Sequence, residues 1–174
     1  MEAQFLTDLE MATSPARLLP YREATSSDRE AIVSYLYNLA LSEALYSPLC
    51  CLEISLRNSL DRALRTRLDS DEWFDRSDLF SPNQRKDILT AKRRALPVHA
   101  PAEAELVPGK VVAELNFGFW TSLLSSTYED ALWRSDRAQL LKEVFPFIPR
   151  RLRQRNTIYA RYNRLRELRN RVFH

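Results

Sequence analysis

Hydrophobic residues recur every three to four positions along most of the chain, which is the spacing of amphipathic α-helices. The clearest apolar stripe contains Leu49, Leu52, Leu56, Leu60 and Ala63, which share one helical face. No stretch shows the glycine-flanked alternation of apolar and polar residues that indicates a β-strand. The pattern therefore predicts an all-α fold, a bundle of about five to seven helices without a sheet.

Proline and capping residues set the expected helix boundaries. We expect helices over about 2–12, 28–68, 82–96, 109–126, 128–144 and 150–174. Pro15 and Pro20 should act as breakers, and Pro48 should kink or break the second helix near Ser47. Gly118 should interrupt its helix or mark close packing.

The segments between these helices are expected to be loops. Residues 69–81 combine acidic and aromatic side chains without a helical period, and residues 97–108 hold three prolines. Ser81 and Pro82 suit the N-cap and first position of the helix that follows. Ser27, with Glu30 three residues later, forms a capping box. We therefore divide the chain into an N-terminal extension at 1–27, which could hold a short helix, and one helical domain at 28–174.

Composition removes several classes of site. The chain has two glycines, two histidines and two neighbouring cysteines, Cys50 and Cys51. These counts exclude a glycine-rich phosphate loop and a four-ligand zinc site, and adjacent cysteines rarely bridge. No apolar run approaches the ~20 residues of a membrane span, and the N-terminus is too polar for a signal peptide. We expect a cytoplasmic protein without cofactor, metal or membrane segment.

Charge is strongly polarised along the sequence. Residues 150–174 carry nine arginines and one acidic residue, a balance of +8, while residues 1–149 carry a balance of −5. Such asymmetry suits an anionic polymer bound at one end of the molecule. Arginine favours bidentate phosphate contacts and stacking on bases. A GC-rich genome would also raise the arginine content, although it explains the clustering poorly.

The last helix places one charge on its apolar face. Ile158, Tyr162, Leu165 and Val172 fall on one side of an ideal helix, and Arg169 lies in their midst. A charged side chain at such a position must be paired, reach a subunit interface or serve chemistry. The alternative is an arginine that snorkels to solvent, or is buried against a carboxylate, and has no chemical role.

The first long helix offers a partner for this arginine. Glu53 lies inside the stripe formed by Leu52 and Leu56, so two apolar faces each carry one charge of opposite sign. If those faces pack together, Glu53 can pair with Arg169. The alternative is a local ion pair between Glu53 and Arg57, one turn further along the same helix.

The final six residues, Arg169-Asn170-Arg171-Val172-Phe173-His174, form an arginine–asparagine pair followed after three residues by histidine. This segment resembles the Arg-x4-6-His motif of HEPN-superfamily ribonucleases. The segments YLYNLALSEALYSPLCCLEISLRNSL at 35–60 and GKVVAELNFGFWTSLLSSTYEDALW at 109–133 resemble, in the same order, the Abi-like abortive-infection proteins of bacteria. Members of that family continue past the motif histidine, whereas the sequence here ends with it.

The resemblance implies a HEPN-like helical bundle with metal-independent endoribonuclease activity in bacterial phage defence, as an abortive-infection protein or a toxin held by an RNA or protein antitoxin. It also implies a homodimer whose two motifs face one cleft. On this interpretation His174 is the general acid and base, because histidine titrates near neutrality. Arg169 stabilises the phosphorane, and Asn170 orients the histidine or the phosphate.

The same resemblance assigns supporting residues. Glu53 would position Arg169 from the first long helix, and Arg57 and Asn58 of the same helix would support the site. Phosphates flanking the scissile bond would be held by Arg161, Arg164, Arg166 and Arg171, since backbone contacts position RNA without reading its sequence.

A different class of function fits the same charges. The chain could be a non-catalytic helical module that binds RNA or a partner protein, with Arg169 in a structural role. A target of modification by a neighbouring gene product is a third hypothesis that one sequence does not address.

Overall fold

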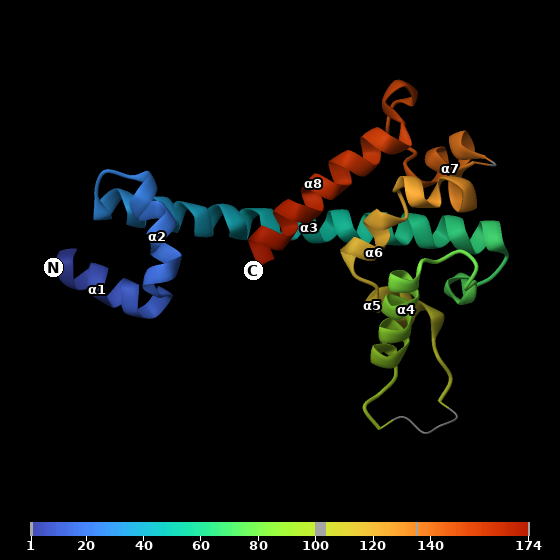
Figure 1. The fold of residues 1–174 in the computed structure, drawn as a ribbon, viewed down its shortest axis with the longest axis horizontal. Coiled ribbons are helices and arrows are strands. Elements are labelled where there is room, and N and C mark those ends of the chain that lie inside the picture. The colour runs from blue at the N-terminus through green and yellow to red at the C-terminus, as the bar shows by residue number, and fades with distance from the viewer. Residues whose placement is uncertain (1, 100–103, 135, 174) are drawn as a thin grey trace. The chain divides into compact units, whose positions relative to one another are not determined.

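The computed structural model describes residues 2–99, 104–134 and 136–173, which form helices and loops without a strand (Figure 1). The α-helices of this part are α1 (Glu2–Thr13), α2 (Pro15–Ala24), α3 (Asp28–Leu68), α4 (Pro82–Ala95), α5 (Pro108–Glu114), α6 (Phe117–Ser122), α7 (Arg137–Val144) and α8 (Arg155–Phe173). Shorter helical turns cover Trp73–Asp75, Ser126–Tyr128, Glu129–Trp133 and Arg150–Leu152. The all-α prediction is confirmed, but the described residues contain eight α-helices, more than the five to seven expected.

One additional helix comes from a break that the sequence pattern placed elsewhere. The helix expected over 109–126 ends at Glu114, and a new helix begins at Phe117. Asn116 causes the restart, because its Oδ1 accepts a hydrogen bond from the backbone N–H of Phe119 at 2.9 Å. Gly118 lies inside the new helix and does not interrupt it. The helix expected over 128–144 is likewise divided, into the π-helical turn Glu129–Trp133 and α7.

Prolines break fewer helices than expected. Pro15 is the first residue of α2, whereas Pro20 lies inside α2 and Pro48 inside α3. Each internal proline removes one hydrogen bond to the carbonyl four residues earlier. Those carbonyls belong to Ala16 and Ala44, which are both exposed. Water can therefore hydrate the freed oxygens, and the helices continue.

Other boundaries agree with the sequence. Ser81 caps α4, accepting a hydrogen bond at its Oγ from the N–H of Gln84 at 3.4 Å. The segment 69–81 is a loop with one short turn. The last helix, however, was expected from residue 150, whereas a separate turn covers Arg150–Leu152 and α8 begins at Arg155. The connection expected over 97–108 is irregular at 97–99 and 104–107, while residues 100–103 lie outside the described residues.

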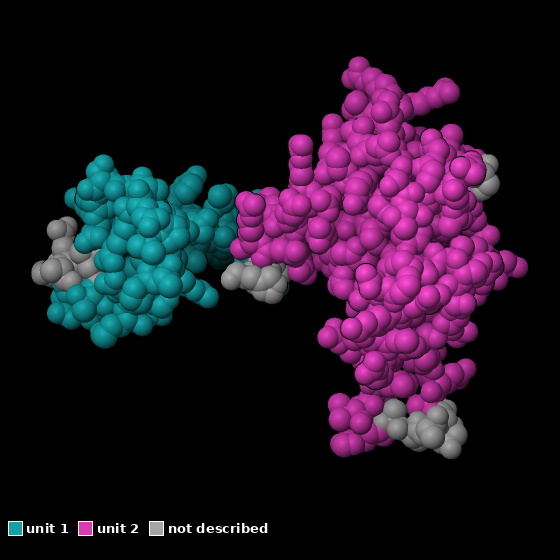
Figure 2. Space-filling model, viewed as in Figure 1, with its two compact units in different colours: residues 1–48, 172–174 teal, residues 49–171 magenta. Residues whose placement is uncertain are grey.

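The chain divides into two compact units, coloured separately in Figure 2. The first contains residues 1–48 and 172–174. In it, Tyr21 packs edge-on against the buried Tyr35, with ring centroids 5.6 Å apart. Arg22 pairs with Asp28 at 2.9 Å and also with Glu10, which ties α1 and α2 to the start of α3. The boundary expected at residue 27 separates an N-terminal extension from a helical domain. The division into compact units does not test it, so it stays a prediction.

The second unit, residues 49–171, is built around three fully buried tryptophans. Their indole N–H groups donate to Asp61 Oδ1 (Trp73, 2.8 Å), Leu115 O (Trp120, 3.1 Å) and Leu123 O (Trp133, 2.8 Å). Each polar atom of these large side chains is therefore satisfied inside the core. The apolar stripe of α3 packs into the same core, with Leu56 and Leu60 both buried.

The stretch 33–46 of α3 is apolar and largely uncovered. Its exposed side chains include Val33, Tyr37, Leu41 and Tyr46, and Tyr37 is 71% exposed. By length and composition α3 could also cross a membrane, a property that core helices of soluble proteins share. This finding revises the expectation that no apolar run approaches membrane length. The absence of a membrane segment stays a prediction.

Candidate functional site

Glu53 of α3 and Arg169 of α8 form an ion pair. Arg169 Nη2 lies 3.2 Å from Glu53 Oε2, and the two side chains are 27% and 19% exposed. The pairing predicted from two oppositely charged apolar faces is therefore confirmed.

Packing of α8 explains why these residues meet. Ile158 is buried, and the ring of Tyr162 lies 6.4 Å from that of Phe117 and 5.7 Å from that of Phe145. Burial raises the pKa of the Tyr162 phenol. Docking this face in the core brings Arg169 to the partly exposed margin, where solvent reduces the cost of desolvating a charge.

Within the described residues, Glu53 and Arg57 do not form the local ion pair that was the alternative. Arg57 Nε donates a hydrogen bond to Asn58 Oδ1 at 3.2 Å. Glu53 is thus directed to α8, while Arg57 and Asn58 contact each other. Of the three supporting residues expected on α3, Glu53 forms an ion pair with Arg169, while Arg57 donates to Asn58.

Arg169 and Asn170, the two proposed catalytic residues that the structure describes, extend from α8 in different directions. Asn170 is exposed and, one residue after Arg169, lies about 100° further around the helix. His174 lies outside the described residues. A single copy therefore does not bring Arg169 and Asn170 to one point.

Three of the four arginines expected to bind RNA share a face. Arg161, Arg164 and Arg171 are exposed and fall within a sector of about 80° on α8; we call them the arginine stripe. Arg166 lies elsewhere, with its Nη2 2.9 Å from Asn163 Oδ1. It also lies close to Gly118, where an added Cβ would be 4.0 Å from the arginine side chain.

Arg155 is a structural residue to which the sequence analysis gave no role of its own. It is 7% exposed, and its Nε donates to Glu129 Oε2 at 2.7 Å. Its other nitrogens donate to the carbonyl of Leu124 and to Asn156. Its burial could have been predicted from its position on the helix, because Arg155 lies within about 60° of Ile158 on the buried face of α8.

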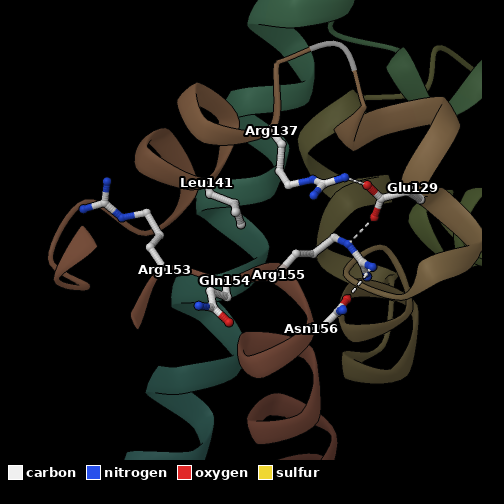
Figure 3. A pocket seen from close by; sticks show the side chains of 7 residues that line it. All are labelled: Glu129, Arg137, Leu141, Arg153, Gln154, Arg155 and Asn156. Atoms are coloured by element: carbon white, nitrogen blue, oxygen red, sulfur yellow. Dashed lines mark hydrogen bonds and ion pairs between the residues drawn. The ribbon is translucent and has the colours of Figure 1, made fainter. Parts of the chain in front are cut away.

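Arg155 and Glu129 line a cleft of about 490 Å³ (Figure 3). Arg137 also pairs with Glu129, so both carboxylate oxygens face guanidinium groups. Figure 3 shows the Arg153 side chain directed away from this pair, and it bonds instead to the carbonyl of Ile148. The charges of the cleft thus hold α8 to the π-helical turn.

Comparison with known proteins yields no relative: no protein-family model, curated protein or solved structure matches the chain. The resemblance to HEPN ribonucleases therefore rests on the sequence motifs alone.

Proposed function

We propose that the protein is a metal-independent endoribonuclease of the HEPN type, acting in a bacterial phage-defence system in the cytoplasm. The observation that carries the proposal is the ion pair between Glu53 and Arg169. It fixes the arginine of the motif at the margin of a packed core, where its side chain stays partly exposed. A preoriented guanidinium is the group that an accumulating phosphorane charge requires.

The reaction follows from the groups of the motif. The 2′-oxygen of the RNA bonds to phosphorus and gives its proton to one imidazole, and the bond from phosphorus to the 5′-oxygen breaks. That oxygen takes a proton from a second imidazole, leaving a 2′,3′-cyclic phosphate and a 5′-hydroxyl. His174 of each of two copies would supply the imidazoles, and Asn170 would orient one of them.

The reaction therefore favours a homodimer with a composite site. The separation of Asn170 from Arg169 around α8 supports this, because a second copy can supply groups that one chain does not bring together. The uncovered stretch 33–46 of α3 offers apolar surface of the kind that homodimers bury. An RNA or protein antitoxin would act on this dimer.

The exposure of the arginine stripe also fits a module that binds RNA, or a protein partner, without cutting it. Arg169 would then only hold α8 to α3.

Two variants separate these functions. For His174→Ala and Arg169→Gln we expect cleavage of a single-stranded RNA to fall at least about 100-fold, because each change removes a group acting on the transition state. Binding to a 2′-O-methyl RNA of the same sequence should persist for His174→Ala. Cleavage should resist EDTA and yield 2′,3′-cyclic phosphate ends.

The control is Arg57→Gln, which alters a charge on α3 outside the ion pair.

Binding by the wild type without cleavage would favour the non-catalytic module. Unchanged cleavage by His174→Ala would refute the assigned mechanism.

A further inference from the structure

Phe147 is an aromatic residue presented to solvent beside an apolar pocket. Its side chain is 96% exposed. The pocket, of about 200 Å³, is lined by Phe147, Leu152, Ile158 and Tyr162 together with Arg161. Covering a phenylalanine side chain gains roughly 1.5–3 kcal/mol, so a ligand that packs on Phe147 would be stabilised by this burial.

The backbone around Phe147 is held in place. Pro146 precedes it, and Arg153 donates to carbonyls on both sides, from Nη2 to Pro146 O at 3.3 Å and to Ile148 O at 2.6 Å. Phe145, two residues earlier, is buried in the core. The short segment is therefore fixed at three points while Phe147 points outward, which is the preorganisation of a binding residue.

Positive charge surrounds the pocket and continues from it. Arg150 and Arg151 are exposed in the turn between Phe147 and α8, and Arg161 is one of the lining residues. Arg161 also begins the arginine stripe, whose last member is ten residues further along α8, about 15 Å away. The cationic stripe is complementary to a chain of phosphates, and the apolar pocket at its start is complementary to a flat ring attached to that chain.

We propose that this pocket receives an unpaired base of single-stranded RNA, which stacks on Phe147 while the neighbouring phosphates contact the arginine stripe. The inference rests on the proposed function and names its substrate class. Bases inside a duplex are stacked on each other and do not reach such a pocket, whereas unpaired bases are commonly held by aromatic side chains.

The test measures binding of 2′-O-methyl oligonucleotides by fluorescence anisotropy, so that no cleavage interferes. Phe147→Ala should weaken binding of a single strand by about 5- to 140-fold, the range for losing one stacked base. Phe147→Trp should bind like the wild type, and Phe147→Leu should resemble Phe147→Ala because it lacks an aromatic face. A strand of abasic units should bind wild type and Phe147→Ala equally, and a duplex should bind more weakly than a single strand.

Val98→Ala is the matched control, because Val98 is 94% exposed and lies in a different loop. Equal single-strand affinity of wild type and Phe147→Ala would overturn base stacking while leaving RNA binding intact. Rescue by Phe147→Leu as well as by Phe147→Trp would point to a general apolar contact, as with a protein partner, and would also overturn it. No binding of any RNA by the wild type would remove the proposed function together with this inference.

Discussion

Arg155 and Arg161 lie six residues apart on α8 in different environments. Arg155 is buried and bonded through Nε to Glu129, whereas Arg161 is exposed. We expect Arg155→Ala to lower the free energy of unfolding by about 1–3 kcal/mol, because the buried carbonyl of Leu124 loses its hydrogen-bond partner while Glu129 keeps Arg137. Arg161→Ala should change it by less than about 0.5 kcal/mol. Urea denaturation of both variants measures the contrast, and equal stabilities would contradict the assigned roles.

Substitution of Glu53 should affect stability and activity to different extents. Its pair with Arg169 is partly exposed, so Glu53→Gln should change the free energy of unfolding by about 1 kcal/mol or less. RNA cleavage should still fall, at least about tenfold, because a neutral amide orients the guanidinium less well. Arg57→Gln should affect cleavage less, since Arg57 bonds to Asn58. Melting temperature and cleavage rate, measured for both variants, test this; wild-type cleavage by Glu53→Gln would refute the positioning role.

At the scale of the helices, apolar periodicity predicted where helices lie better than where they end. The spacing around Ser81 predicted α4 closely, because a capping serine and a following proline act locally. The division of α5 from α6 depends on one side-chain hydrogen bond of Asn116, which competes with a continuous helix and has no periodic signal. Pro20 and Pro48 do not end their helices, because solvent exposure, which a sequence does not reveal, lowers the cost of a freed carbonyl.

The start of α6 allows a double-mutant test. Asn116→Ala should cost about 1 kcal/mol through loss of the cap. A Cβ on Gly118 would lie 3.0 Å from Asn116 Oδ1, so Gly118→Ala should destabilise the wild type by displacing the cap. In the Asn116→Ala background the same change should be neutral or stabilising by up to about 1 kcal/mol, because alanine favours helix. Additive effects in chemical denaturation would show that the two residues are not coupled.

Over the whole molecule, polarised charge was evident from sequence, but its division between surface and interior was not. Among the nine C-terminal arginines, Arg153, Arg155, Arg166 and Arg169 have bonding partners within the described residues. The pairing of Arg169 was predictable because both charges interrupt apolar stripes. Arg153 bonds to backbone carbonyls of a nearby turn, which no residue pattern marks.

Because four of the nine C-terminal arginines bond within the protein, we expect the affinity for RNA to depend only moderately on salt concentration. The five remaining arginines, which are all exposed, should give a slope of log affinity against log salt of about −3.5 for single-stranded RNA. Nine surface arginines would give about −6. Affinity measured from 50 to 300 mM salt distinguishes the two, and a flat response would mean that the arginine stripe does not bind RNA.

The uncovered stretch 33–46 of α3 has a consequence for mass action. If a second copy covers it, folding and association are coupled, and the melting temperature should rise by a few degrees over a hundred-fold increase in protein concentration. Tyr37→Glu, which places a charge on this surface, should abolish the rise. A melting temperature that follows added detergent, and not concentration, would indicate a lipid-facing helix instead. If folding and association are coupled in this way, the stability of the protein depends on its concentration. Below the dissociation constant of the dimer the chains unfold and are open to proteolysis, and above it dimer formation protects them.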